Sequence, residues 1–183
     1  MDPRADMYPL LRLFNAIRLA RRDGAMDIAA TDSLPTRVWL NDLDMFLELS
    51  NGRQLMLYDL GRTKFAARIG LLRALRREGW GLAVAGSFIR YRKRLTLFQT
   101  FEMRTRFVGR DGRFLLLEQA MWRGETCHSH LLIRTVVTGP DGVVDPSDVA
   151  DALGYPRDIA QQLPDWVHGM LTAESGRPWP PEV

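Results

Sequence analysis

The sequence has few of the residues on which several classes of protein depend. Its one cysteine, Cys127, cannot form an internal disulfide, and we expect the chain to work in a reducing, cytoplasmic compartment. It has three histidines, and His128 and His130 alternate along one segment. Two histidines at this spacing can bind zinc, but no third ligand is evident in the sequence, so we expect neither a metal nor a cofactor.

The chain also lacks a long hydrophobic run. The apolar segment from Tyr8 to Phe14 is interrupted by Arg12 and is too short for a bilayer span, which takes about 20 apolar residues. It does not have the charge order or the cleavage site of a signal peptide. We interpret it as a short amphipathic helix packed on the domain, so we expect no transmembrane segment. The alternative is a helix on a membrane surface, with basic residues around an apolar face.

Charge of one sign is only slightly in excess. The net charge is +3 and the pI is about 9.4, and the excess is arginine in short clusters such as Arg90 to Arg94. Such a cluster favours a phosphate-bearing ligand, but it is weak evidence for nucleic acid, and we predict no nucleic-acid partner. With 183 residues, of which 46% are hydrophobic and 26% charged, the chain fits one globular domain plus terminal extensions.

Hydrophobic periodicity predicts a strand followed by a long helix. The β-rich run from Thr36 to Leu40, directly after Pro35, is typical of a first strand. From Gln54 to Leu75 apolar residues recur every three or four positions, which predicts a helix. Ser50 or Asn51 is a natural N-cap for this helix and Gly79 a natural end, while Gly61 could divide the helix in two.

The remaining chain predicts four long strands and then two short helices. The strands cover about residues 82–94, 97–109, 112–123 and 125–138, separated by turn signals such as Asp111-Gly112 and Arg123-Gly124. We expect them to form an antiparallel meander. Helices are predicted from Pro146 to Leu153 and from Arg157 to Leu171.

This order of elements predicts an α+β fold. The long helix after the first strand must bury its apolar face, and a twisted antiparallel sheet wrapped around it offers that cover. Helices packed on a flat sheet are the alternative. We expect an amphipathic extension over residues 1–30, the main domain over residues 31–143 and a helical extension over residues 144–183.

Candidate chemistry lies between the first strand and the long helix. Asp42 and Asp44 directly follow the strand, and Asn51 stands at the start of the helix. Unpaired backbone N–H groups at a helix N-terminus can polarise a carbonyl and stabilise an oxyanion. A nearby carboxylate can attack that carbonyl or activate a water, and thioester hydrolysis needs these two parts and no metal. Aspartates in such a place are also common turn formers and caps.

Two segments carry a resemblance to a known family. The segment NDLDMFLELSNGRQLMLYDLGR and the strand region from Arg77 to Glu125 resemble the thioesterase superfamily member six branch of the 4-hydroxybenzoyl-CoA thioesterase type, over about residues 36 to 138. The resemblance implies a hot-dog fold and an acyl-CoA thioesterase that forms free acid and CoA. It further implies a homodimer with sites at the interface, with a tetramer as a further option. Asp44 matches the family's catalytic carboxylate, and Asn51 matches the second residue of its Asn-Asn pair.

Several further positions are candidates for substrate contacts or mark departures from the family pattern. The substrate-binding candidates are Glu48, Gly52, Leu55, Tyr58, Arg90 and Arg92. Asp59 is a backup carboxylate, although an ion pair with Arg62 or Lys64 is the favoured interpretation of that residue. The departures are Glu48 in place of a histidine, Ser50 in place of an asparagine, Phe46 in place of a polar residue and Gln54 in place of a tyrosine. They leave open a non-catalytic module that binds acyl thioesters or fatty acids, and a third hypothesis is a peripheral membrane or scaffold protein.

Overall fold

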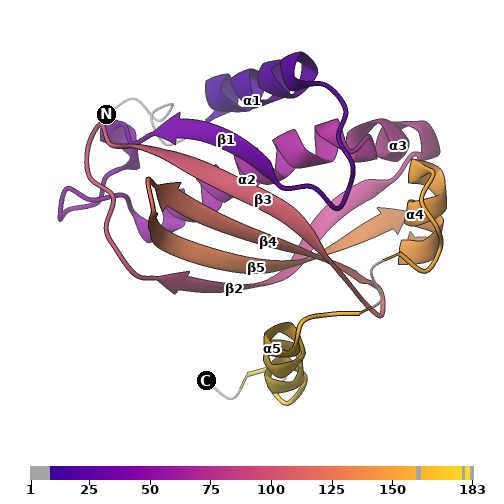
Figure 1. Ribbon diagram of the computed structural model, residues 1–183. Coiled ribbons are helices and arrows are strands. Elements are labelled where there is room, and N and C mark those ends of the chain that lie inside the picture. Colours follow the sequence, from indigo (N-terminus) through magenta and orange to yellow (C-terminus); the bar gives the residue numbers. More distant parts are fainter. Residues whose placement is uncertain (1–8, 160–161, 179, 182–183) are drawn as a thin grey trace.

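A curled antiparallel sheet wraps around one long helix, as the hot-dog expectation requires (Figure 1). The computed structural model describes residues 9–159, 162–178 and 180–181. The strands are β1 (Asp32–Arg37), β2 (Gly81–Tyr91), β3 (Thr100–Asp111), β4 (Phe114–Arg123), β5 (Thr126–Gly139) and β6 (Gly142–Val143). The helices are α1 (Leu10–Asp23), the 3-10 turn η2 (Leu40–Asp42), α2 (Asn51–Arg68), α3 (Leu71–Glu78), α4 (Pro146–Leu153) and α5 (Asp165–Ser175).

The strand order corrects the predicted meander in one respect. The order is β1-β3-β4-β5-β2, so β3, β4 and β5 form a meander, whereas β2 pairs with β5 and not with β3. The segment between β2 and β3 instead crosses the open end of the sheet, where Phe98 donates its N–H to the carbonyl of Val38 at 2.9 Å. The predicted hairpin at Asp111-Gly112 is confirmed, because Asp111 pairs with Phe114 around Gly112 at φ 52°.

The first strand begins earlier than the sequence pattern predicts. β1 spans Asp32–Arg37 rather than Thr36–Leu40, and it includes Pro35. Pro35 is tolerated because β1 is an edge strand that pairs only with β3, and a proline there need not remove a ladder hydrogen bond.

Helix α2 is buried along most of its length and approaches the sheet closely. Gly61 does not divide it. A Cβ at Gly61 would lie 3.1 Å from Thr105 Oγ1 and 3.3 Å from Met103 Cγ, so the missing side chain allows the helix to contact β3. The break comes at Gly70, whose φ of 85° separates α2 from α3, and Gly79 ends α3 at φ 68° as predicted.

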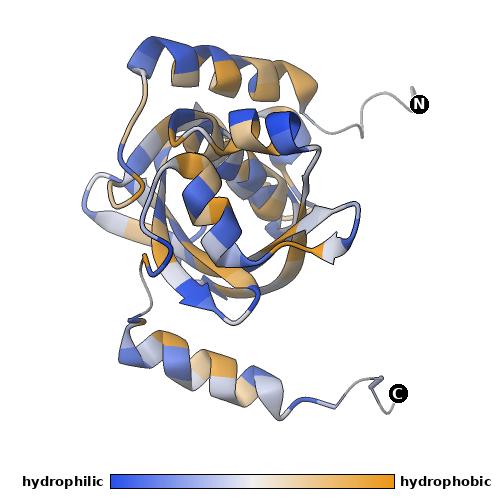
Figure 2. Cartoon of the chain, turned by 90° about the vertical axis from the view of Figure 1, so that its right-hand side faces the viewer, coloured by the Kyte–Doolittle hydropathy of each residue, from blue (hydrophilic) through white to orange (hydrophobic). Residues whose placement is uncertain are grey.

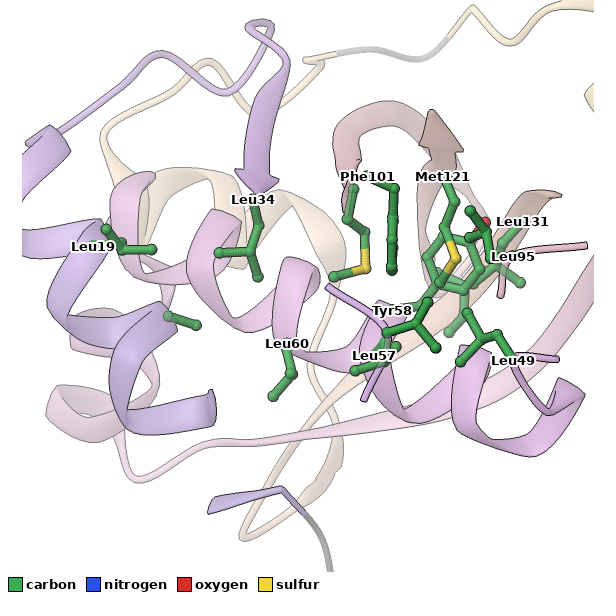
Figure 3. Packing of buried hydrophobic residues seen from close by; sticks show 14 residues of the cluster. Leu19, Leu34, Leu49, Leu57, Tyr58, Leu60, Leu95, Phe101, Met121 and Leu131 are labelled. Atoms are coloured by element: carbon green, nitrogen blue, oxygen red, sulfur yellow. The ribbon is translucent and has the colours of Figure 1, made fainter. Parts of the chain in front are cut away.

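Two apolar clusters surround the two halves of α2. Figure 3 shows the first, in which Leu57, Tyr58 and Leu60 of α2 meet Leu19 of α1 and Leu34 of β1. The second joins the C-terminal half of α2 to α3, β5 and α4. Its buried members are Ile28, Phe65, Ala66, Ile69, Leu71, Leu75, Val137 and Val149. The N-terminal helix therefore packs on the domain, as we expect from its amphipathic sequence.

The C-terminal helices take different places. α4 matches its predicted range and is capped by Asp145, which accepts a hydrogen bond from the Ser147 N–H at 2.8 Å. α5 begins at Asp165 rather than Arg157, because Pro164 would remove a backbone hydrogen bond inside a longer helix. Its Val167 packs on Leu116 and Leu132, so α5 lies on the opposite side of the molecule from α1 (Figure 2). No helix within the described residues has the length and apolar character of a membrane span.

Candidate functional site

A short hairpin leads from β1 to α2. Leu43 pairs with Leu49 in an isolated antiparallel bridge, and the Asp44 N–H donates to the Glu48 carbonyl at 2.9 Å. The hairpin is held to the segment after β2, where the Leu49 N–H donates to the Leu95 carbonyl at 2.7 Å. Residues 45–47 form its tip. The loop therefore has a defined shape, and it delivers the chain to the first turn of α2.

The first turn of α2 has no side-chain cap. Ser50 occupies the N-cap position, but its side chain makes no capping hydrogen bond. Asn51 and Gly52 are exposed, and a Cβ at Gly52 would meet only Ser50 Oγ at 4.0 Å. The first backbone N–H groups of a helix have no partner within the helix, so this turn can offer them to an anion or a polarised carbonyl.

Asp44 is half-buried and shapes the hairpin. Its Oδ1 accepts a hydrogen bond from the Phe46 N–H at 2.9 Å and a longer one from the Glu48 N–H at 3.4 Å. This is the geometry of an aspartate that stabilises a turn, which is the structural role that the sequence also suggests. The other carboxylate oxygen, Oδ2, takes part in neither of these two hydrogen bonds. The catalytic role of Asp44 stays a prediction.

Asp42 has a different task. Its carboxylate is fully buried and receives Arg12 of α1 at 2.7 Å and Arg53 of α2 at 3.5 Å. It also accepts the Trp39 N–H at 2.9 Å. Two guanidinium groups therefore balance its charge, and this residue ties the 3-10 turn η2 to both helices.

The predicted substrate contacts on α2 separate into two groups. Gly52 and Leu55 are exposed near the start of the helix. Tyr58 is fully buried, its hydroxyl lies 2.8 Å from Ser129 Oγ, and burial raises the pKa of Tyr58 well above its ordinary value. Tyr58 is therefore part of the core between α2 and β5, and its role as a substrate contact stays a prediction. Glu48 is half-buried and pairs with Thr96 through its backbone.

The basic segment at the end of β2 lies close to the start of α2. Tyr91 directs its hydroxyl to the Asn51 carbonyl at 3.5 Å, which brings the two element ends together. Arg90 and Arg92 flank Tyr91 and are both exposed. Arg90 also borders a small depression on the outer face of the sheet beside His130. Within this segment it is Tyr91 that contacts the start of α2, and the role of Arg90 and Arg92 in substrate binding stays a prediction.

An apolar cavity lies at the other half of α2. It has a volume of about 130 Å³ and is enclosed by the C-terminal half of α2, α3, the start of β2 and α4. Asp59 and Arg62 line it, and they form an ion pair at 2.9 Å, as the interpretation of Asp59 as a salt-bridge residue predicts. The sequence pattern predicts α4 but not that Val149 and Ala150 would close this cavity. Within the described residues, no three metal-ligating side chains come together.

Comparisons with known proteins agree with this architecture. A model of the thioesterase-like superfamily matches residues 38–146. Protein THEM6 of Danio rerio is similar to this chain, with 30% identity over 184 residues that cover 93% of this chain and 89% of the fish protein. The crystal structure of YbaW, a probable thioesterase from Escherichia coli, is similar with a TM-score of 0.62 and 14% identity, over 69% of this chain and 98% of that one.

A further solved structure, of SAV2348 from Staphylococcus aureus in complex with CoA, has a TM-score of 0.62 and 12% identity. It matches 79% of this chain and 96% of that one. At such identities the solved structures show a shared fold. The long match to the fish protein adds sequence similarity over nearly the whole chain.

Proposed function

Because this chain belongs to the thioesterase-like superfamily, we propose that it is an acyl-CoA thioesterase, which converts an acyl-CoA thioester to a free acid and CoA. The observation that carries the proposal is the uncapped first turn of α2 behind a hairpin that holds the half-buried Asp44. The complex of SAV2348 with CoA supports the ligand class.

In the proposed reaction, the backbone N–H groups of Asn51 and Gly52 polarise the thioester carbonyl. Asp44 takes a proton from a water that attacks the carbonyl carbon, or it attacks the carbonyl itself. The negative charge that develops on the carbonyl oxygen is stabilised by the N-terminus of α2. The C–S bond then breaks, and the CoA sulfur leaves as a thiolate. In the first route the thiolate takes up, through water, the proton that Asp44 removed, so the carboxylate is regenerated. In the second route an acyl–Asp44 anhydride forms, and a water hydrolyses it to the free acid and the Asp44 carboxylate.

We further propose that two copies of the chain pair along β2. This strand is an edge of the sheet, is 11 residues long and is exposed along most of its length. An exposed edge is a template for pairing, and twofold symmetry makes such a pair antiparallel. The end of β2 beside Asn51 in one protomer would then face the start of β2 in its partner.

This arrangement makes Asp59 the second candidate for the catalytic carboxylate. The start of β2, at Leu82 to Val84, lines the same apolar cavity as Asp59. In an antiparallel pair, the first turn of α2 from one protomer would thus lie toward the cavity of the other. The cavity could receive the acyl group, and exposed Arg90 and Arg92 could bind the phosphates of CoA. We keep Asp44 as the leading residue because it lies on the segment that resembles the family's motif.

The alternative function is binding of an acyl thioester or a fatty acid without hydrolysis. Glu48 stands where the family has a histidine and lies on the same hairpin as Asp44. We propose that its carboxylate adds negative charge that disfavours the oxyanion. If this charge prevents catalysis, the variant Glu48→His would gain turnover. A cytoplasmic location remains a prediction that depends on the single cysteine.

The test is the release of the CoA thiol from a panel of short, long and aromatic acyl-CoA substrates, detected with a thiol reagent. We expect catalytic turnover of at least one class by the purified wild-type protein. Tight binding of CoA together with no turnover of any substrate would instead establish the binding module.

A further inference from the structure

One end of the molecule exposes large apolar side chains on a projecting loop. The tip of the hairpin before α2 consists of Met45, Phe46 and Leu47, which are 86%, 73% and 70% exposed. The loop extends beyond the sheet on the left of Figure 1. Three adjacent apolar side chains on such a tip are unusual for a soluble surface and indicate a contact with something apolar.

Two other segments extend this surface. The first turns of α1 expose Leu10, Leu11 and Phe14, and α1 is tied to η2 by the ion pair of Arg12 with Asp42. On the other side of the hairpin, Trp39 and Phe98 are both exposed and form an edge-to-face ring pair with centroids 6.0 Å apart. We call the exposed apolar residues of these three segments the apolar end.

The backbone is strained at this same surface. Among the described residues, positive φ outside glycine occurs at Leu47, with φ 58°, and at Phe98, with φ 62°. Such conformations cost free energy for bulky side chains and persist where the surrounding structure enforces them. Both residues are exposed, so the strain is not offset by burial of their own side chains in this chain.

Basic side chains border the apolar end. Arg92, Lys93 and Arg94 are exposed and directly precede Leu95, which pairs with Leu49 at the base of the hairpin. The guanidinium of Arg37 lies 5.7 Å from the centre of the Trp39 ring. The acidic residues of the hairpin, Asp44 and Glu48, lie behind the tip and are half-buried. The charge around the exposed tip is therefore mainly positive.

We propose that the apolar end docks the protein on the surface of an anionic lipid bilayer. The tip at Met45 to Leu47 and the first turns of α1 enter the headgroup region, and the basic segment contacts acidic headgroups. A second copy of the chain is a less suitable occupant, because a symmetric pair would bring the basic side chains that border the apolar end toward those of the partner. The edge of β2 offers copies a continuous backbone surface instead. This docking is independent of thioester hydrolysis.

The test is cosedimentation of the full chain with vesicles of phosphatidylcholine alone or with 30% phosphatidylglycerol, at low and high salt. We expect binding to the anionic vesicles that weakens at high salt. The triple variant Met45→Ser, Phe46→Ser, Leu47→Ser should lower the partition coefficient by about 1,000-fold, since each of the three buried side chains contributes about tenfold. The matched control is Val143→Ser, which changes an exposed apolar residue of β6 and should bind as the wild type does.

A second variant tests the charge separately. Lys93→Gln with Arg94→Gln should reduce binding to anionic vesicles by about tenfold and remove much of its salt dependence. Wild-type protein that does not bind anionic vesicles at low salt would overturn the proposal, as would a triple variant that binds unchanged. A triple variant that changes the oligomeric state, with vesicle binding unaffected, would show that a second copy covers the apolar end.

Discussion

The two ends of helix α2 differ in the contacts that hold them. At the C-terminal half, Lys64 is 1% exposed, and its ammonium contacts Asp32 at 2.7 Å and Asp23 at 2.9 Å. These contacts join α2 to β1 and to the end of α1. At the N-terminal end, the first turn is uncapped and exposed, and the hairpin before it has Leu47 in a strained conformation. The C-terminal half is held by a buried lysine between two carboxylates. At the N-terminal end the buried Asp42 likewise holds Arg53, but the first turn has no side-chain cap.

This difference shows how a domain can hold a helix whose first turn has no side-chain cap. Buried contacts along the C-terminal half fix the direction of α2, so the amides at the start of the helix need no stabilising contacts of their own. The uncapped first turn and the strained Leu47 therefore lie together, in the hairpin before α2 and at the start of the helix.

The largest expected effect on stability comes from removing the buried lysine at the C-terminal half of α2. Lys64→Met removes the cation that faces Asp32 and Asp23, and it leaves a buried carboxylate with less compensation. We expect a loss of about 3–5 kcal/mol in the free energy of unfolding, measured by chemical denaturation. The control is Arg73→Met on the exposed face of α3, which should change stability by less than about 0.5 kcal/mol. Equal losses of unfolding free energy in the two variants would contradict the stabilising role of Lys64 between Asp32 and Asp23.

A pair of glycine variants compares the two ends directly. Gly61→Ala places a methyl group 3.1 Å from Thr105 Oγ1 and 3.2 Å from Gln119 Nε2. We expect it to destabilise the protein by about 1–2 kcal/mol, since overpacking outweighs the gain in helix propensity. Gly52→Ala meets no close atom and should be neutral or slightly stabilising. Thermal or chemical unfolding of both variants provides the measurement, and a stabilised Gly61→Ala would show that α2 can move away from β3.

The smallest expected effect is a dependence on acid pH. A hydrogen bond from Lys64 lowers the pKa of Asp23 from 3.8 to about 2. Because folding favours the carboxylate, its stabilisation is present above about pH 4 and is lost as the pH falls toward 2. Unfolding curves of wild type and Asp23→Asn should therefore differ at neutral pH and converge near pH 2. If the stabilities of the two proteins differed by the same amount at every pH in this range, Asp23 would not be a source of the pH dependence.

Local signals in the sequence predict most of the elements. Asp111-Gly112 predicts the β3–β4 hairpin because a tight turn depends on a few adjacent residues, and the range of α4 is predicted by a similarly local pattern. The failures are non-local. The start of β1 depends on Pro35 lying at an edge, and the pairing of β2 with β5 depends on contacts between residues far apart in the chain.

The candidate site was predictable only in part. The position of Asn51 at the start of α2 follows from the hydrophobic period, and it is confirmed. Apart from the family resemblance, the sequence does not distinguish Asp42 from Asp44, because the burial of Asp42 depends on Arg12 of α1. Tyr58 has the chemistry of a ligand contact, but its hydrogen bond to Ser129 across the core is visible only in three dimensions.

The most direct test of the account is the turnover of acyl-CoA by Asp44→Asn and Asp59→Asn beside the wild type. Asparagine can keep the turn at position 44 through its side-chain oxygen, so the first variant removes the charge while it preserves the hairpin. The account predicts that Asp44→Asn lowers kcat by about 100-fold to 10,000-fold and that Asp59→Asn lowers it by less than about tenfold. Wild-type turnover by Asp44→Asn would contradict the assignment, and a large loss in Asp59→Asn alone would identify the cavity carboxylate as the catalytic one.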